Sequence, residues 1–288
     1  MPTDQLELPD DRRVYLTLDL ECDYGTALGT SHYNAVQHAD QLAAVLESHD
    51  VPLSCFLQTQ ILEECPETID PFLSATVPVE FHAHSHTHPP RASADVPSEV
   101  AESVRRVRER FDTEPIGFRF PDGAAQAGDY AVLADHDVAF SSSVFPSWRP
   151  GRFNNLRGSR EPYRVSEIDV VELPFTVYSD FLRIPVSLSY LKLFGAAFER
   201  LVTTRPPRII IFDFHMHDLV VPSTYSDLSA PYRAVYARNK YDGLAMLDRI
   251  IGRLQKQGCT FGRISDLYDA VAGADFKDWT EVTDTDGR

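Results

Sequence analysis

This sequence has few cysteines and no long apolar run, and these absences exclude several classes of protein. Four of its 288 residues are cysteines, and their spacing is neither that of a zinc ribbon nor that of a small disulfide-bonded scaffold. No stretch approaches the roughly 18 to 20 uninterrupted apolar residues of a membrane-spanning helix. The sequence start, MPTDQLELPDDRR, contains neither the basic nor the apolar part of a secretory signal, so we expect a cytoplasmic protein.

Basic residues are also in short supply. The chain has 27 Lys and Arg against 43 Asp and Glu, which gives a formal net charge of −16 at pH 7. Nucleic acids and anionic membranes are bound by basic surfaces, so we expect neither as a partner. An acidic balance of this size is common in proteins that work in concentrated salt, and a halophilic environment is a hypothesis. With 43% hydrophobic and 11% aromatic residues, the chain can still bury a sizeable core.

Short apolar runs with a high β-propensity recur between longer helical patterns, which is typical of an α/β fold. Eight such runs predict strands at residues 14–20, 53–58, 79–83, 117–120, 138–142, 170–175, 209–215 and 259–264. Apolar residues at steps of three and four predict an amphipathic helix over 96–111, with Asp95 as its N-cap. Similar patterns predict helices over 39–46 and 244–254, the latter followed by Gly258 at a C-cap position.

The chain shows no internal repeat and no Gly/Ser-rich linker. We therefore expect a single domain over residues 12–272, followed by an acidic C-terminal tail over residues 273–288. The segment 146–163, with its Arg, Asn, Gly and Pro residues, predicts a long surface loop. Such a loop is either variable in sequence or carries substrate contacts.

Histidines are concentrated in two short segments. Six of the ten lie in two clusters at the ends of predicted strands: His82, His84, His86 and His88, and His215 and His217. Neutral imidazole is the commonest zinc ligand at pH 7. If the chain turns into a helix after Ala83, His84 and His88 share one face and can chelate one ion. If the segment stays extended, all four histidines of the first cluster lie on one side. Both alternatives predict a metal site.

Acidic residues stand at alternate positions at the end of the first predicted strand. Asp19, Glu21 and Asp23 all point to one side if the chain remains extended there. Three neighbouring carboxylates raise one another's pKa unless a cation neutralises them, and catalytic zinc often takes two histidines and a carboxylate. The alternative is a solvated acidic turn. Beside the histidine clusters, we favour a metal site with an open position for water.

Four motifs occur in a fixed order along the chain: TLDLE, HSHTHP, RFPDG and IIIFDFH. In this order they resemble the NodB-homology polysaccharide deacetylases, which form carbohydrate esterase family four. The segments VPLSCFLQT, FSSSVFP and VVELPFT are most similar to the capsule and exopolysaccharide deacetylases of that family. The resemblance implies a distorted (β/α) barrel of seven or eight strands. It also implies a hydrolase that removes N-acetyl or O-acetyl groups from a carbohydrate with a divalent metal, usually Zn²⁺.

The resemblance further implies roles for individual residues. Asp19 matches the general base, and Arg119 matches the arginine that pairs with this base and tunes it. His84 and His88 match the two metal histidines. His215 matches the late histidine that protonates the leaving amine.

Two positions, Leu20 and Ser141, depart from the family pattern, and the register of the late histidine is a further uncertainty. Leu20 stands where the family has a second aspartate that binds the metal, and Glu21 is the substitute that we expect as the metal carboxylate. His217, followed by an aspartate, is an alternative to His215 as the acid. Ser141 replaces an aspartate of the capsule subgroup, which alters either the sugar pocket or the support of Arg119.

Two other interpretations stay open. Metal-dependent amidohydrolases and phosphoesterases on similar barrels also carry histidines at strand ends. A noncatalytic relative that binds carbohydrate or metal would explain the changes at Leu20 and Ser141, but it would need no base, arginine and acid together. For a cytoplasmic enzyme we expect a soluble substrate, either an acetylated sugar such as a nucleotide sugar or a small amide. The sequence indicates no oligomeric state.

Overall fold

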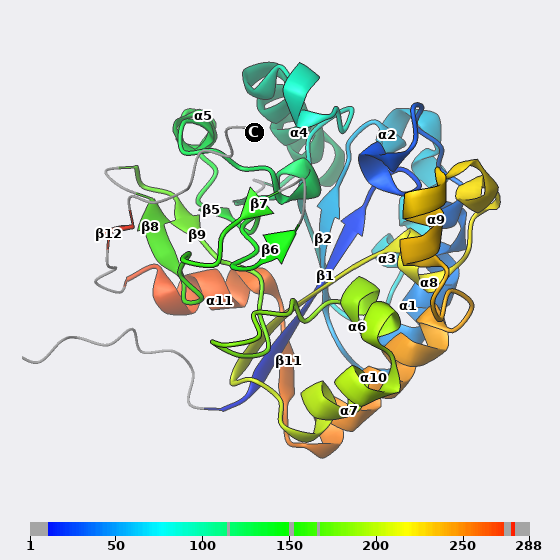
Figure 1. The fold of residues 1–288 in the computed structure, drawn as a ribbon. Coiled ribbons are helices and arrows are strands. Elements are labelled where there is room, and N and C mark those ends of the chain that lie inside the picture. Colours follow the sequence, from blue (N-terminus) through cyan, green and yellow to red (C-terminus); the bar gives the residue numbers. More distant parts are fainter. Residues whose placement is uncertain (1–10, 114–115, 150–152, 166–167, 274–277, 280–288) are drawn as a thin grey trace, which may run out of the picture.

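A curled β-sheet forms the centre of the computed structural model (Figure 1), which describes residues 11–113, 116–149, 153–165, 168–273 and 278–279. Seven neighbouring strands run parallel, in the order β10-β1-β2-β3-β4-β5-β9. Their bounds are β1 Arg13–Leu20, β2 Leu53–Leu57, β3 Val79–Ala83, β4 Gly117–Phe118, β5 Phe140–Ser141, β9 Val171–Glu172 and β10 Ile209–His215. The predicted α/β fold with a distorted barrel is confirmed.

Three further strands lie at the end of this sheet or beside it. β8, Tyr163–Val165, runs antiparallel to β9, and β12, Asp278–Trp279, pairs with β8. The predicted strand 259–264 is present as β11, Thr260–Gly262, which pairs with the beginning of β1. β12 belongs to the predicted acidic tail, most of which lies outside the described residues.

The ring of strands closes through one side chain. Thr176 follows β9, and its Oγ1 donates to the carbonyl of Ile209 (3.2 Å) and accepts from the amide of Ile211 (2.9 Å), both on β10. A single bridge between Ser187 and Asp213 continues this contact along β10. In the described part of the chain, β9 and β10 share no strand ladder, and the barrel is therefore distorted at this point.

Helices surround the sheet. Their bounds are α1 Ala39–His49, α2 Ile61–Glu64, α3 Asp70–Leu73, α4 Val96–Phe111, α5 Asp129–Ala134, α6 Leu188–Phe194, α7 Ala196–Thr204, α8 Met216–Leu219, α9 Ala230–Tyr236, α10 Gly243–Lys256 and α11 Ile264–Val271. α1, α4 and α10 confirm the three predicted helices, and Asp95 caps α4 by accepting from the amide of Ser98 (3.4 Å). In Figure 1, α1, α6, α7 and α10 lie on one side of β1, while α11, β8 and β9 lie on the other. Within the described ranges, every helix falls short of the length and hydropathy that crossing a bilayer requires.

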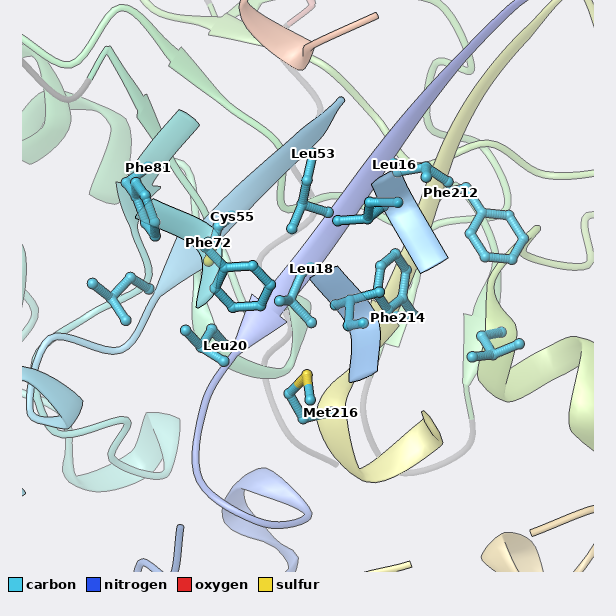
Figure 2. Close-up of a cluster of buried hydrophobic side chains, with 14 of the residues drawn as sticks. Leu16, Leu18, Leu20, Leu53, Cys55, Phe72, Phe81, Phe212, Phe214 and Met216 are labelled. Carbon is cyan, nitrogen blue, oxygen red and sulfur yellow. The ribbon is translucent and has the colours of Figure 1, made fainter. Parts of the chain in front are cut away.

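Alternation along β1 separates the hydrophobic core from the interior of the barrel. Leu16, Leu18 and Leu20 are almost fully buried and pack in the cluster that Figure 2 shows, which also contains Met216. Each such leucine contributes roughly 1.5–3 kcal/mol relative to an exposed one. The residues between them, including Asp19, point to the opposite face. Position 20 therefore belongs to the core.

The segment 146–163, which we expected to be a long surface loop, contains a hairpin of β6, Trp148–Arg149, and β7, Phe153–Asn154. The buried ring of Phe153 stacks on Phe145 with 5.7 Å between the ring centroids. The Arg183 side chain donates to two backbone carbonyls of the segment, at 3.3 and 2.9 Å. The segment is therefore anchored to the rest of the fold.

Candidate active site

Polar side chains from four strands meet at the carboxyl ends of β1, β3, β4 and β10. They are Asp19, Glu21, His84, His88, Arg119, Asp213 and His215. All except His215 are almost fully buried. Several of them line a pocket of about 680 Å³ whose wall continues over β6, α6 and α9. Carboxyl ends of parallel strands are the usual place for a ligand in such folds, and this volume suits a small organic ligand.

The expected metal ligands Glu21, His84 and His88 lie together. Glu21 Oε2 is 3.1 Å from His84 Nε2 and 2.6 Å from His88 Nε2. One ligand atom from each residue lies within 4.8 Å of the other two. Burial opposes the ionisation of Glu21, but the charge on His88 and the hydrogen bond to His84 hold the pKa of Glu21 well below its usual value. An ionised carboxylate and two imidazoles form a donor set that catalytic zinc takes.

The backbone of the histidine segment is neither helical nor extended, so both alternatives from the sequence are wrong. β3 ends at Ala83, and the chain then turns with positive φ angles at Ser85 (66°) and His88 (58°). Such left-handed conformations are uncommon outside glycine and cost on the order of 1–3 kcal/mol each. The turn brings the rings of His84 and His88 to 5.1 Å between centroids. We call residues 84–88 the histidine turn.

Glu99 of α4 holds the histidine turn, a role that the sequence analysis missed. Its Oε2 accepts from the Ser85 hydroxyl (2.5 Å) and from the amides of His86 and Thr87 (both 2.8 Å). Its Oε1 accepts from the Thr87 hydroxyl (2.5 Å). Burial opposes ionisation, but the hydrogen bonds from Ser85 and Thr87 outweigh it and lower the pKa of Glu99. An ionised carboxylate on α4 thus fixes the strained backbone that carries both histidines.

Three details fit a cation bound beside Glu21, His84 and His88. Both ring nitrogens of His88 are buried without a hydrogen bond of good geometry, although Nε2 faces the Glu21 carboxylate. His84 Nδ1 lies 2.8 Å from the carbonyl of Arg119, which makes Nδ1 the donor and leaves Nε2 as a ligand atom. Gly25 has a φ of +53°, and a Cβ there would lie 3.0 Å from Glu21 Oε1 and 3.2 Å from His88 Cε1. Glycine is therefore required for this close approach.

Arg119 lies between two carboxylates and two aromatic rings. Its Nη1 is 2.5 Å from Asp19 Oδ1 and 3.0 Å from Asp213 Oδ1. Its guanidinium carbon is 3.9 Å from the ring centroid of Phe56 and 4.4 Å from that of Phe175. Burial and the charge of Asp19 raise the pKa of Asp213 to about 7. The structure therefore places Arg119 in direct contact with both Asp19 and Asp213.

A second buried network supports the chain around Arg119. Arg119 Nε donates to the carbonyl of Ser142 (2.7 Å). Glu172 Oε1 accepts from the amide of Ser143 (2.8 Å), and burial raises the pKa of Glu172. Ser141 Oγ lies 2.8 Å from Ser143 Oγ. Ser141 therefore contacts Ser143, whereas Ser142 is the residue that contacts Arg119.

His215 ends β10, and its side chain is 22% exposed, toward the pocket. Its Nδ1 lies 3.0 Å from Asp218 Oδ2, and its Nε2 lies 3.7 Å from Asp19 Oδ2. Burial opposes protonation, but the hydrogen bond with Asp218 and the charge of Asp213 raise the pKa of His215 well above its usual value. The contacts of His215 thus favour the protonated form of its ring, and Nε2 faces the pocket.

His217, the alternative acid, has a different environment. Its buried Nδ1 accepts a hydrogen bond from the amide of Tyr24 (3.1 Å). Burial and the neighbouring charge of His215 lower the pKa of His217 to about 4. The ring is therefore neutral near pH 7 and stacks on His215 with 4.8 Å between centroids. These surroundings favour His215 as the acid.

Three other candidates from the sequence lie outside the cluster. Asp23 accepts from the amide of Ala35 and the hydroxyl of Thr224, both at 2.8 Å, so it ties two loops together instead of lining the pocket. The expectation that it points with the other two carboxylates is wrong. His82 Nε2 lies 3.2 Å from a glutamate of its own strand. His86 Nδ1 lies 3.0 Å from the hydroxyl of a threonine that follows β2.

Comparison with known proteins finds one sequence family and many similar structures. The sequence model of the family described as polysaccharide deacetylase matches residues 8–140. A candidate polysaccharide deacetylase from Mycobacterium smegmatis is 16% identical, with a TM-score of 0.63 over 97% of each chain. A peptidoglycan N-acetylglucosamine deacetylase is 13% identical, with a TM-score of 0.54 over 90% of this chain and 89% of that chain.

Another similar structure is a pseudoenzyme of carbohydrate esterase family four from Bacillus anthracis. It is 14% identical, with a TM-score of 0.56 over 91% of this chain and 67% of that chain. Identities of this size show a shared fold and do not fix the activity. No curated protein sequence matches the chain. The sequence match over residues 8–140 and the shared fold together support the polysaccharide deacetylase family for this chain.

Proposed function

We propose that this chain is a metal-dependent hydrolase that removes N-acetyl groups from a carbohydrate and releases acetate and the free amine. The family match and the structural neighbours support a hydrolase that acts on carbon–nitrogen bonds in acetylated carbohydrates. One observation carries the proposal. The cluster of three metal ligands lies beside a carboxylate and a histidine, because Asp19 Oδ2 is 3.9 Å from His84 Nε2 and His215 Nε2 is 3.9 Å from Glu21 Oε1.

Glu21, His84 and His88 would hold the cation, and their oxygen and nitrogen donors suit Zn²⁺. Three protein ligands would leave a coordination position for water or substrate. When bound, a divalent cation polarises an acetyl carbonyl and lowers the pKa of a water toward about 7.

Asp19 is the proposed general base. Its Oδ1 bonds to Arg119, while its Oδ2 faces the space between His84 and His215. The buried guanidinium fixes the position of the carboxylate, whose Oδ2 can accept the proton of the attacking water. Arg119 touches Asp19 rather than the reacting atoms, and it is a positioning residue in this proposal.

His215 is the proposed general acid. A proton must reach the nitrogen as the carbon–nitrogen bond breaks, because an amide anion is too poor a leaving group. The hydrogen bond with Asp218 orients the ring and helps to raise the pKa of His215, which keeps the proton available at neutral pH. An ester needs this proton less, so the arrangement supports N-deacetylation over O-deacetylation.

A noncatalytic role is the competing proposal, because a similar structure is described as a pseudoenzyme. The change that favours it is Leu20, where the family has a metal-binding aspartate. In this fold Leu20 packs in the core, and Glu21 occupies the position beside both histidines. The substitution thus leaves a complete set of three candidate ligands, and we favour the enzyme.

Several finer expectations stay predictions from the sequence. These are the particular likeness to capsule and exopolysaccharide deacetylases, the cytoplasmic location and the high-salt environment. Zinc, as opposed to another divalent ion, is proposed from the donor set alone. The substrate class of the proposed enzyme is an acetylated carbohydrate.

The test is acetate release from N-acetylglucosamine oligomers by protein reconstituted with Zn²⁺, with metal content measured on the same samples. We expect the wild type to bind about one zinc per chain and to release acetate. The double variant His84→Ala/His88→Ala should lose both properties. His86→Ala is the matched control, because His86 lies in the same histidine turn but outside the metal cluster.

The outcomes separate the competing proposals. Zinc binding without acetate release from N-acetylated or O-acetylated sugars would contradict the deacetylase and favour the noncatalytic role. Wild-type protein that binds no zinc after reconstitution would contradict the metal site itself. Equal loss of zinc in His86→Ala would show that the variants unfold the turn instead of removing ligands.

A further inference from the structure

The pocket has a second part, away from the catalytic carboxylates, whose residues no step of the proposed reaction uses. This part comes from the β6 hairpin, α6 and the region of α9. Its members include Trp148, Arg149, Tyr190, Tyr232, Tyr236 and Arg238. Trp148 is 57% exposed, which is unusual for a tryptophan and typical of a binding surface.

The segment that carries Arg149 has a charge opposite to that of the chain. Residues 148–164 contain five arginines and one glutamate, within a chain whose net charge is −16. Two of these arginines are neutralised, since Arg160 pairs with Asp180 and Arg164 pairs with Asp169. Within the described part of the chain, Arg149 forms no such ion pair.

Arg149 and Arg238 both line the pocket, and neither has a carboxylate partner among the residues that the structure describes. Arg119 on the pocket floor differs, because Asp19 and Asp213 compensate its charge. Arg149 and Arg238 therefore place positive charge without a carboxylate partner on the side of β6 and α9. Arginine in this state is suited to bind a carboxylate or a phosphate through two parallel hydrogen bonds.

Tyr236 shows that this positive region lies close to the catalytic groups. Burial and the charge of Asp218 raise the pKa of Tyr236, while the charge of Arg149 lowers it. One phenol is thus within electrostatic range of both Arg149 and the aspartate that orients His215. A ligand that occupies a pocket of about 680 Å³ can span both regions.

We propose that the substrate carries an anionic group, a carboxylate or a phosphate, which Arg149 and Arg238 bind while the acetyl group lies at Asp19 and His215. This inference rests on the proposed function and adds the substrate's charge to it. The net charge of −16 repels anions at long range, so an anionic ligand needs local cations to bind. A neutral sugar would gain little from two unpaired arginines.

The experiment compares three N-acetylated ligands. They are a neutral N-acetylglucosamine oligomer, an oligomer of alternating N-acetylglucosamine and glucuronate, and uridine diphosphate N-acetylglucosamine. Binding is measured by calorimetry on zinc-loaded His215→Gln protein, in which turnover is slow, and kcat/KM is measured on the unaltered enzyme. The second and third ligands distinguish a carboxylate from a phosphate.

We expect at least one anionic ligand to bind about tenfold or more tightly than the neutral one, with an affinity that falls as salt is added. Arg149→Gln and Arg238→Gln should each remove about tenfold of the affinity for that ligand and leave the neutral ligand unchanged. Arg157→Gln is the matched control, because Arg157 is exposed on the same segment and does not line the pocket.

Equal binding of neutral and anionic ligands would overturn the inference, as would arginine variants that weaken both kinds equally. Failure of the proposed function gives a different result. In that case no ligand releases acetate, while the calorimetric preference and its loss in Arg149→Gln and Arg238→Gln are still observed.

Discussion

Replacing Glu99 with glutamine tests whether a remote carboxylate holds the candidate metal ligands His84 and His88 in place. Glu99 contacts neither Glu21 nor the pocket, and it acts only on residues 85–87 of the histidine turn. Glutamine keeps the shape of the side chain but removes its charge and one of its two acceptor oxygens. The variant therefore weakens the support of the turn without altering any candidate ligand.

The magnitude follows from the contacts. Glu99 accepts four hydrogen bonds, and a hydrogen bond to a charged group contributes about 1.5–3 kcal/mol when it is buried. Partial exposure of Glu99 reduces this sum, and the left-handed backbone at Ser85 and His88 already costs on the order of 1–3 kcal/mol for each residue. We expect the free energy of unfolding to fall by about 2 kcal/mol. Zinc affinity should fall by about 10- to 100-fold, the usual effect of losing a group that positions a ligand.

The assay is a zinc titration against a competing chelator, followed by acetate release at low and at saturating zinc. If Glu99 positions the ligands, saturating zinc restores most of the activity of Glu99→Gln. Glu102→Gln is the control on the same helix, because Glu102 pairs with Arg105 and Arg106 outside the histidine turn. A folded Glu99→Gln protein with wild-type zinc affinity would refute the reasoning.

The groups around the pocket give three more expected outcomes. His215→Ala should lower kcat/KM for an N-acetyl substrate by about 10²- to 10⁴-fold, and for a matched O-acetyl substrate much less. Equal losses for the two substrates would contradict the role of His215 as the acid. Asp218→Asn removes a hydrogen bond that raises the pKa of His215, so protonated His215 is lost at lower pH. The alkaline limb of the pH–rate profile should then move down by about one to two pH units, and an unmoved limb would assign it to another group. Gly25→Ala forces a side chain into a left-handed backbone against Glu21, which should cost about 1–2 kcal/mol in thermal unfolding and weaken zinc binding. Gly29→Ala, which has open space around it, should change neither, and equal effects of the two would contradict the crowding argument.

Elements with local signals are predictable from the sequence. The predicted helix over 96–111 has the same bounds as α4, because its apolar spacing and its N-cap at Asp95 are both encoded within it. The seven parallel strands are likewise apolar runs between helical patterns. Closure of the ring by Thr176 is not predictable, because a single threonine hydroxyl that bonds to a distant strand leaves no periodic signal.

The candidate site also has a part that the sequence predicts and a part that it does not. The motifs predict Glu21, His84 and His88 as ligands, and the structure places these three residues close together. The backbone that gathers them is not predictable, because the positive φ angles of the histidine turn depend on a tertiary contact with Glu99. The one sequence signal for Glu99 is an acidic residue in the first turn of a helix, which the helix dipole explains equally well.

Hydrogen bonds between buried polar groups are the other feature that cannot be predicted from the sequence. Glu172 bonds to the amides of Ser143 and Val144 and to the hydroxyl of Tyr130, and these partners lie far from it in the chain. By contrast, the alternation of side chains along β1 can be predicted from the sequence. It buries Leu20 in the core and places Asp19 on the opposite face, inside the barrel.

In the proposed mechanism Glu21 binds the metal, and Asp19 accepts the proton of the attacking water. One measurement separates these two roles. Zinc content and acetate release are measured on Glu21→Gln and Asp19→Asn proteins that remain folded by circular dichroism. The proposed roles predict that Glu21→Gln loses zinc and activity together, whereas Asp19→Asn keeps its zinc and loses about 10²- to 10⁴-fold in rate. Zinc loss in Asp19→Asn, with zinc retained in Glu21→Gln, would contradict them.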